Sequence, residues 1–454
     1  MNSNIIFLII DSFSSDKFFG LKKTSITPNI DYLIKNGTYF SEAITSSDAT
    51  ILSWSSIYTG RFPFKTGIRS SRFNKLDQDI PTIFDYLTKN NYAFYSFTPT
   101  FSETIGLFPN FKNENNIYDF TETLDSGLGD KILSLLSSKK MQSPWFLNIH
   151  LLDLHYPLLV PSVFDDEQFG FSKYERIISS IDDWIGKFIK KIDFENTILV
   201  VTSDHGTNIR KLKKNKQIFD FEDDGINEIR KKRLTNKIPT VFKPIKDKIF
   251  FSIESRKKIQ KSTKISNYEL TPYEKRSLLS GHYSIDHDLF DEKLRVPLLF
   301  YGKNIDKDKI FSKQVRLVDI LPTICYLTDI SFDYNNSDGK NLLPLKNEEI
   351  FQESPAYIES NPLIDKKSND VIGIRTSKFK YFRDSESQNK RIHLFDLSND
   401  YHEEHNIAST NKTKVLEMEK ILQDFLNNFN KAKPKNDDLT SDEIENELRK
   451  MGYV

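Results

Sequence analysis

The stretch "NTILVVTSDHG", residues 196–206, decides the fold of this chain. Its first half is a run of β-branched residues and leucine, and the run ends abruptly in the polar pair Asp204 and His205. The stretch "NIIFLIID", residues 4–11, has the same character and ends in Asp11. Short, wholly apolar runs of this kind are typical of parallel strands that are buried on both faces. Each strand therefore presents a carboxylate at its carboxyl end.

Helical patterns alternate with further strand patterns along the chain. Helices are expected at 27–37, 80–92 and 172–192, and strands at 93–99, within 145–157 and at 295–302. This alternation predicts an α/β fold, a mostly parallel sheet flanked by helices on both faces. Ligands of such sheets bind beyond the carboxyl ends of the strands, where Asp11, His155, Asp204 and His205 would lie.

A hydroxyl-rich segment, "TSSDATILSWSSIYTGRFPFKTG" at residues 45–67, sits where a helix should begin. The positions after Thr50 suit an amphipathic helix, and Gly60 is a natural C-cap. The simplest interpretation of Thr50 is an N-cap, because Ser and Thr side chains accept hydrogen bonds from the first turn. A hydroxyl at a helix start can also serve as a nucleophile, and the rest of the chain must decide between the two roles.

Composition limits the function classes. The 454 residues carry no net charge, so we expect no nucleic-acid partner. The single cysteine, Cys325, lies in an apolar run and is compatible with a reducing compartment. The apolar run at residues 5–10 is too short for a signal peptide, and no run is long enough to span a bilayer. A soluble, cytoplasmic protein is the default expectation.

The chain divides into unequal parts. We expect a catalytic domain over 1–345, a small C-terminal α+β subdomain over 346–432 and a charged tail over 433–454. The C-terminal subdomain should hold two strands followed by a helix. Residues 207–276 contain 20 Lys or Arg and 9 Asp or Glu, a local excess of +11. This basic insertion is either a solvated, partly disordered segment or a lid over an anionic substrate.

The candidate side chains fit a divalent-metal site. Two carboxylates at strand ends, a histidine beside the second one and a hydroxyl at a helix start suit Mn, Zn, Mg or Ca to different degrees. A hydroxyl that touches a metal has a lowered pKa and becomes a nucleophile. The order of these elements along the chain is more specific than the "DHG" triplet alone.

In that order of elements the chain resembles the sulfatases, within the alkaline phosphatase superfamily. The matching blocks cover nearly the whole chain apart from the insertion and the tail. They are "NIIFLIIDSFSSD" (4–16), "TPNIDYLIKNGTYFSEAITSS" (27–47), "ILSWSSIYTGRFPFKTG" (51–67), "FLNIHLLDLHYP" (146–157), "VVTSDHG" (200–206), "HDLFDEKLRVPLLFYG" (287–302), "VRLVDILPTI" (315–324), "DGKNLLPLK" (338–346), "GIRTSKFKYF" (373–382) and "HLFDLSNDYHEEHNIA" (393–408). The resemblance implies an alkaline-phosphatase-like fold and an ester hydrolase.

Several positions depart from the sulfatase pattern. Sulfatases typically carry Cys or Ser in "C-x-P-S-R" and convert it to formylglycine, whereas this chain aligns Thr50 there, with Trp54 at the Arg position. No formylglycine is therefore expected. The usual Asp pair after the first strand is Asp11-Ser12 here, and the Lys and His motif expected after residues 90–97 is not apparent. Threonine nucleophiles are typical of the phosphodiesterase, phosphonate hydrolase and phosphoglycerol-transferase relatives.

The resemblance implies one divalent ion held by Asp11, Thr50, Asp204 and His205, with Thr50 attacking the ester and Thr favouring phosphorus over sulfur. His155 and His287 would stabilise the transferred group or protonate the leaving oxygen, with His282 a weaker candidate. The alternatives are a turn-capping role for His155, a loop role for His287, and a second metal at Asp153 and His155. The expected partner is an anionic ester, with a glycan or other polymer among the candidates.

Three alternatives remain open at the level of function: a sulfuric ester hydrolase acting on a glycan, a phosphoglycerol-type transferase, and a catalytically degenerate binder of anionic glycans.

Overall fold

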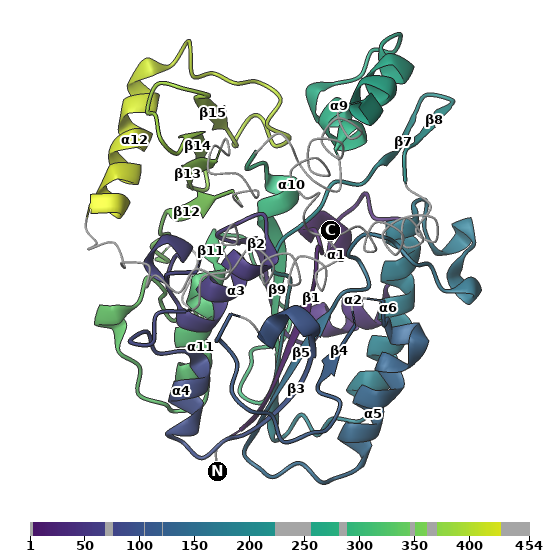
Figure 1. The fold of residues 1–454 in the computed structure, drawn as a ribbon, viewed down its shortest axis with the longest axis vertical. Helices are drawn as coiled ribbons and strands as arrows, with labels where there is room; N and C mark the ends of the chain where they lie inside the picture. Colours follow the sequence, from purple (N-terminus) through teal and green to yellow (C-terminus); the bar gives the residue numbers. More distant parts are fainter. Residues whose placement is uncertain are drawn as a thin grey trace, which may run out of the picture.

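The computed structural model describes residues 3–68, 76–103, 105–119, 121–222, 256–280, 288–345, 350–360 and 370–427. A central sheet stands between two layers of helices, and a smaller sheet and a separate lobe lie beyond its carboxyl end (Figure 1). The predicted α/β class is confirmed. No helix among these residues combines the length and the apolar character needed to cross a bilayer.

The central sheet has nine strands in the order β10-β2-β9-β6-β1-β5-β3-β4, with β11 paired to β2. The strands are β1 (Asn4–Ile10), β2 (Thr38–Ile44), β3 (Ala93–Pro99), β4 (Ile117–Tyr118), β5 (Trp145–Leu151), β6 (Thr197–Thr202), β9 (Arg295–Gly302), β10 (Lys309–Phe311) and β11 (Val315–Arg316). β1 pairs in parallel with β5 and β6, so the residues after these three strands emerge at one edge. β9 runs antiparallel to β2 and β6, which makes the sheet mixed.

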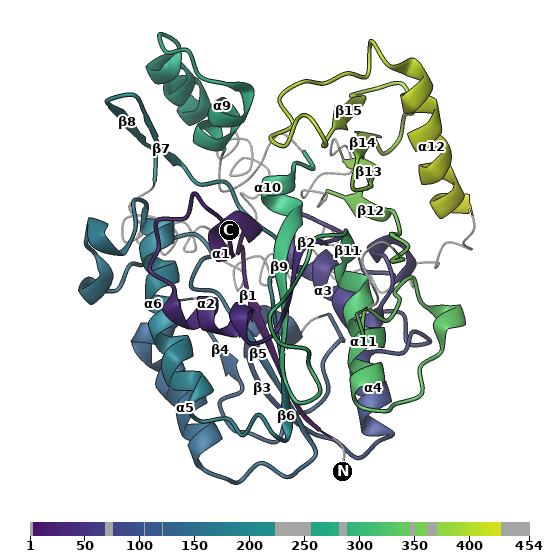
Figure 2. The ribbon, with the colours of Figure 1, turned by 180° about the vertical axis from the view of Figure 1, so that it is seen from behind.

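The helices form one group on each face of the sheet (Figures 1 and 2). One group is α2, α5 and α6, and the other is α3, α4 and α11. Their bounds are α2 (Pro28–Lys35), α3 (Thr50–Thr59), α4 (Ile83–Thr88), α5 (Gly129–Ser137), α6 (Lys173–Ile189) and α11 (Ile320–Leu327), with the short α1 (Ser15–Phe18) after β1. The helices expected at 27–37, 80–92 and 172–192 are all present.

Helix α3 is buried along its whole length and is therefore not the amphipathic helix that its pattern suggested. Gly60 ends it with φ 64°, the left-handed C-cap that glycine favours. Two polar side chains of α3 reach β5. The Tyr58 hydroxyl donates to Asn148 Oδ1 over 2.6 Å, and Trp54 Nε1 donates to His150 Nδ1 over 3.1 Å.

The spacing explains this fit. Four residues of helix rise about 6 Å and two residues of strand span about 6.6 Å. The pairs 54–58 and 148–150 are therefore nearly equal in length, and they fix the register of α3 on β5. Because α3 runs against the direction of β5, its first residue, Thr50, lies at the carboxyl edge of the sheet.

The C-terminal region forms a four-stranded antiparallel sheet, β12-β13-β14-β15, where two strands were expected. The segment at 371–384 is itself a hairpin. The elements are β12 (Ala356–Glu359), β13 (Val371–Arg375), β14 (Phe379–Asp384), β15 (His393–Asp396) and α12 (Lys412–Asn427). Phe62, which follows α3, shares an apolar cluster with Tyr357 and Leu422, so this sheet and α12 pack on the end of α3. The predicted tail at 433–454 lies outside the described residues.

Part of the basic insertion forms a lobe with its own small core of Phe219, Ile265, Leu270 and Leu278. The lobe comprises β7 (Lys211–Lys214), β8 (Gln217–Asp220), helical residues 256–265 and α9 (Pro272–Leu279). Its contacts with the C-terminal region are specific. The ring of Tyr273 stacks on His402 at 4.2 Å, and Arg276 donates to the Glu403 carbonyl over 3.2 Å and to the His402 carbonyl.

A buried ion-pair network joins the C-terminal sheet to α10 (Asp291–Leu294), which leads into β9. Lys380 is fully buried. Its Nζ lies 2.7 Å from Glu403 Oε1, also forms an ion pair with Asp291, and donates to the Leu289 carbonyl. Arg375 forms a further ion pair with Asp291 over 2.8 Å.

We predict that Lys380→Met lowers the free energy of unfolding by about 3 kcal/mol, because it leaves the buried Glu403 carboxylate without its cation, whereas Asp291 keeps Arg375. Urea titration measures the change. Lys378→Met is the matched control, since Lys378 is exposed two residues away. Equal free energies of unfolding for the two variants would contradict the role of this network.

Candidate metal centre

Two loops at the carboxyl edge of the sheet bring Asp11 and Asp204 together. Asp11 follows β1 directly, and its amide donates to the Leu151 carbonyl over 2.9 Å. Ser12 then turns the chain with a left-handed φ of 61°, a conformation that few non-glycine residues adopt. The Tyr174 hydroxyl of α6 donates to the Ser12 carbonyl and so holds this turn in place.

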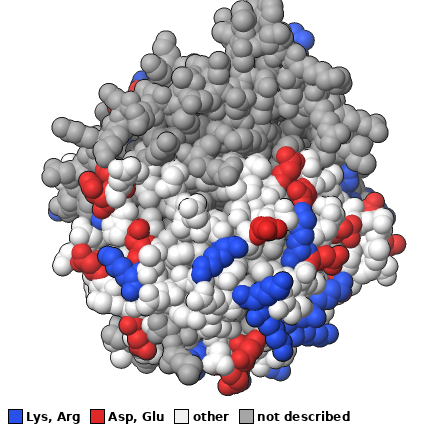
Figure 3. Space-filling view, turned by 60° about the horizontal axis from the view of Figure 1, so that its bottom comes forward, with Lys and Arg blue, Asp and Glu red and all other residues white. Residues whose placement is uncertain are grey.

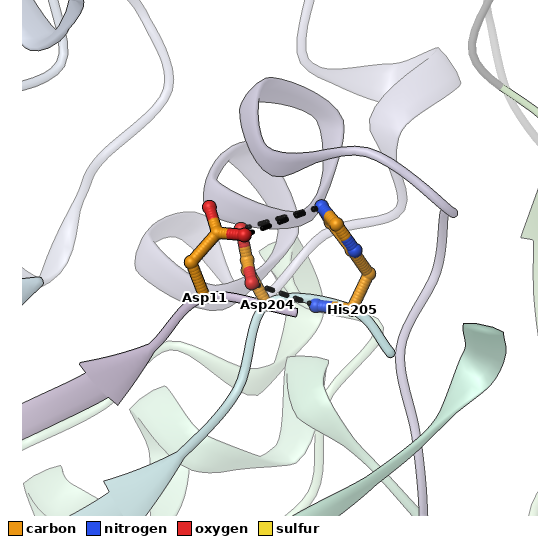
Figure 4. Close-up of side chains that lie close together, drawn as sticks. All are labelled: Asp11, Asp204 and His205. Carbon is orange, nitrogen blue, oxygen red and sulfur yellow. Dashed lines mark hydrogen bonds and ion pairs between the residues drawn. The ribbon is translucent and has the colours of Figure 1, made fainter. Parts of the chain in front are cut away.

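Three side chains converge beyond these strand ends (Figure 4). Ligand atoms of Asp11, Asp204 and His205 all lie within 4.8 Å of one another. His205 Nε2 lies 3.8 Å from Asp204 Oδ2 and 4.0 Å from Asp11 Oδ1. Both carboxylates are fully buried and the histidine is nearly so.

Thr50 completes the group from the first turn of α3. Its Oγ1 donates to Asp11 Oδ2 over 3.2 Å and lies 3.4 Å from His205 Nε2. The N-cap of α3 is Ala49, so the simple capping interpretation of Thr50 is wrong. The four residues that the sequence assigned to a metal, Asp11, Thr50, Asp204 and His205, therefore do lie together.

The two carboxylates shape the protonation of the site. Burial alone would raise the pKa of Asp11, but the hydrogen bond from His150 and the positive charges of His155 and His205 hold it far below its usual range. Burial lowers the pKa of His205, yet the charges of Asp204 and Asp11 outweigh burial and raise it. The field at His205 Nε2 thus favours a positive charge.

The donor set fits a divalent cation. Asp204 Oδ1 accepts the amide protons of Ser12 and His205, whereas Oδ2 is a buried atom without a hydrogen-bond partner among the described residues. The His205 Nδ1 lies 2.9 Å from the Gly206 carbonyl, which can only accept, so the neutral ring carries its proton there. Its Nε2 lone pair then faces the carboxylates, as a metal ligand requires.

Comparison with known proteins gives this arrangement a family. The family model described as "Sulfatase" matches residues 3–330, and a second one, "N-sulphoglucosamine sulphohydrolase, C-terminal", matches residues 280–432. The chain belongs to the sulfatase family. The sulfatases are ester hydrolases of the alkaline-phosphatase-like superfamily, whose members generally use a divalent metal, as the resemblance implied.

Individual relatives of this sulfatase-family chain are distant. It is 30% identical to "Arylsulfatase K" of Gallus gallus over 159 residues, which is 32% of this chain and 30% of that protein. The chain thus spans less than a third of the length of this curated relative. The fold matches Phosphonate Monoester Hydrolase of Agrobacterium radiobacter with a TM-score of 0.65 at 15% identity, over 94% of this chain and 96% of that one. It matches Ps i-CgsB in complex with k-i-k-neocarrahexaose with a TM-score of 0.61 at 19% identity, over the whole of both chains.

The candidate histidines have different outcomes. His155 is half-buried in the turn after β5, and its positive charge lowers the pKa of Asp11, which places it near the metal centre. His287 and His282 lie outside the described residues, so their roles stay predictions.

One residue beside the candidate metal centre escaped the sequence analysis. His150 lies within β5, fully buried, with Nε2 3.3 Å from Asp11 Oδ2. A titratable side chain inside a largely apolar strand, two residues after Asn148, was the available signal. The strand pattern masked this signal, because the partners of His150 come from distant parts of the chain.

Asp153, which follows β5, is a buried acid with an unusual pKa. Burial raises the pKa of Asp153 to about 7, although its Oδ1 accepts the Leu124 amide over 2.9 Å. Its Oδ2 has no hydrogen-bond partner among the described residues. The folded protein therefore binds a proton here that the unfolded chain releases near pH 3.8.

We predict that the protonated Asp153 contributes at most about 4 kcal/mol to the free energy of unfolding. This contribution is fully present below about pH 4 and is lost as the pH rises through about 7. Asp153→Asn keeps the acceptor for Leu124 and cannot ionise. The measurement is urea unfolding in the presence of a chelator at pH 5, 6, 7 and 8. The free energy of unfolding of the variant should increase relative to that of the wild type as the pH rises. A difference that stays constant across this range would contradict the assignment.

Proposed function

We propose that this protein is a divalent-metal-dependent hydrolase of a sulfate- or phosphate-type ester, with Thr50 as the nucleophile. The position of Thr50 carries the proposal. Its hydroxyl lies at the start of α3, within 3.4 Å of both Asp11 Oδ2 and His205 Nε2. A helix N-terminus favours anions, so an ester group that approaches Thr50 meets a favourable field.

Asp11, Asp204 and His205 would hold one divalent ion, with Thr50 as the fourth protein ligand. Mn, Zn, Ca and Mg all suit two carboxylates, an imidazole and a hydroxyl to different degrees. When bound, such an ion polarises the ester and lowers the pKa of a coordinated hydroxyl.

The residues divide the chemistry between them. Thr50 Oγ1 would release its proton to water, because a coordinated hydroxyl has a lowered pKa, and would form a bond to the central phosphorus or sulfur. The bond to the leaving oxygen breaks with its electron pair, and a protonated His155 or His287 supplies the proton for that oxygen. Water then cleaves the Thr50 ester and restores the hydroxyl. No formylglycine takes part.

The nature of the ester separates the candidates. A threonine nucleophile favours a phosphodiester or a phosphonate over a sulfate. The alternative is a sulfuric ester hydrolase acting on a glycan, and the similarity to a protein named arylsulfatase K supports the sulfuric ester part of it. A phosphoglycerol-type transferase differs only in its acceptor. A degenerate glycan binder is disfavoured, because mere binding has no need for the grouping of Asp11, Thr50, Asp204 and His205.

The lobe beside the site supports an anionic polymer as substrate. Its described residues, 207–222 and 256–276, carry 12 Lys or Arg and 4 Asp or Glu. A cavity of about 440 Å³ in the lobe is lined in part by Lys214, Lys216 and Tyr268. The face seen in Figure 3, at the other end of the molecule, carries acidic side chains among its basic ones.

We predict that Thr50→Ala remains folded and loses activity by about 10³-fold or more, because the nucleophile is gone. Thr50→Ser should keep part of the activity, since it retains the hydroxyl. The assay uses chromogenic sulfate, phosphate monoester, phosphodiester and phosphonate substrates, each with Mn, Zn, Ca and Mg.

Thr59→Ala is the matched control, because Thr59 is a buried threonine at the far end of the same helix. It should melt lower and turn over normally. The nucleophile would be refuted by a Thr50→Ala variant that behaves in the same way.

We predict further that the double variant Lys213→Glu/Lys216→Glu binds dextran sulfate about 10-fold more weakly and with a shallower salt dependence. Both lysines are exposed on the lobe. Binding is titrated at about 50 and 200 mM NaCl, between which the screening of charges increases. The control is Lys139→Glu/Lys140→Glu, an exposed pair in the turn after α5. Equal losses in the two double variants would remove the specific role of the lobe.

A further inference from the structure

A series of three hydrogen-bonded side chains connects α3 to the metal centre. Trp54 Nε1 lies 3.1 Å from His150 Nδ1, and His150 Nε2 lies 3.3 Å from Asp11 Oδ2. All three side chains are fully buried. They come from α3, from β5 and from the residue after β1, so these hydrogen bonds connect the elements that build the site.

The donor and acceptor atoms fix the direction of these hydrogen bonds, from Trp54 through His150 to Asp11. The indole N–H can only donate, so His150 Nδ1 must accept and carries no proton. The ring proton then sits on Nε2, which donates to the Asp11 carboxylate. Trp54 thus sets the tautomer of His150, and His150 delivers one donor to Asp11 Oδ2. Ser12 Oγ donates to the other oxygen, Oδ1, over 2.6 Å, so both oxygens of Asp11 are held.

The indole of Trp54 is fixed by aromatic neighbours. It stacks on Phe101 at 5.3 Å with an angle of 21° between the rings, and Phe108 meets it edge-on at 5.2 Å. The His150 ring meets the indole edge-on at 4.8 Å. These contacts leave the N–H one direction, which is toward His150. Trp54 also lies four residues after Thr50, on the same side of α3.

We propose that His150 and Trp54 are positioning residues that orient the Asp11 carboxylate toward a divalent cation, with Trp54 acting only through His150. This inference rests on the proposed metal site. Groups that hydrogen-bond a metal ligand typically contribute 10- to 100-fold to metal affinity. The helix that carries the hydroxyl of Thr50 would in this way also aim the carboxylate beside it.

Mn²⁺ binding by isothermal titration calorimetry tests the proposal on the full chain. Trp54→Phe keeps an aromatic ring and removes the N–H, and it should weaken Mn²⁺ binding by about 10-fold. The matched control is Trp184→Phe, because Trp184 is also buried and its Nε1 has no hydrogen-bond partner among the described residues. This control should bind Mn²⁺ as the wild type does.

A double-mutant cycle tests the order of action. In the His150→Leu background, Trp54→Phe should cause no further loss of Mn²⁺ affinity, because its effect passes through the imidazole. An equal loss of Mn²⁺ affinity in both backgrounds would overturn the proposal that Trp54 acts through His150. Turnover of Trp54→Phe should recover at saturating Mn²⁺, and a loss that persists there would also overturn it.

Two further results separate the possible failures. A wild type that binds no Mn²⁺, Zn²⁺, Ca²⁺ or Mg²⁺ refutes the metal site and the positioning together, whereas a normal Kd in Trp54→Phe refutes the positioning alone. If Trp54→Phe does not fold, His150→Gln and His150→Leu carry the test. Glutamine keeps a donor and should bind Mn²⁺ more tightly than leucine, and equal affinities would overturn the proposal.

Discussion

The register of α3 against β5 is the constraint on which the site depends. The hydrogen bonds from Tyr58 to Asn148 and from Trp54 to His150 fix the fully buried helix α3 on strand β5. A one-residue slip would turn these donors by about 100° around the helix, away from their acceptors. Since both acceptors are buried, such a slip would leave unpaired polar groups, which cost about 1–3 kcal/mol each. Thr50 therefore reaches the edge of the sheet at one position, beside Asp11.

The buried charges of the molecule are balanced in one place and unbalanced in another. In the network beneath the C-terminal sheet, the carboxylates of Asp291 and Glu403 both have a buried ammonium as partner. In the metal centre, Asp204 Oδ2 has no hydrogen-bond partner among the described residues, and His205 lies between two buried carboxylates that have no Lys or Arg as an ion-pair partner among those residues. The rise in the pKa of His205 is the response of a proton to this excess of negative charge. A divalent cation responds to the same field more strongly, because its charge is twice as large.

The sequence predicts the parts of the fold that local chemistry determines. The apolar residues 4–10 and 197–202 strongly favour buried strands. The carboxyl ends of these strands bring Asp11 and Asp204 to one edge of the sheet. The direction of a strand is not written in its own residues, so the antiparallel β9 was not foreseen. Strand β2, with its mixed polar pattern, was likewise missed. His150 was overlooked because its role depends on Trp54, which lies 96 residues earlier in the chain. The domain boundary at 345/346 and the role of His287 stay predictions.

Two departures from the sulfatase pattern have a joint electrostatic consequence. Ser12 stands where the resemblance implies a second aspartate, and Trp54 stands where it implies an arginine. One negative and one positive charge are therefore absent, and both are replaced by neutral hydrogen-bond donors to the Asp11–His150 unit. The two losses cancel in net charge, and a divalent ion on Asp11 and Asp204 would be nearly neutralised, so it would leave little positive charge for the substrate. If the proposed ion is bound there, we expect the site to favour a singly charged ester, such as a phosphodiester, a phosphonate monoester or a sulfate ester, over a doubly charged phosphate monoester.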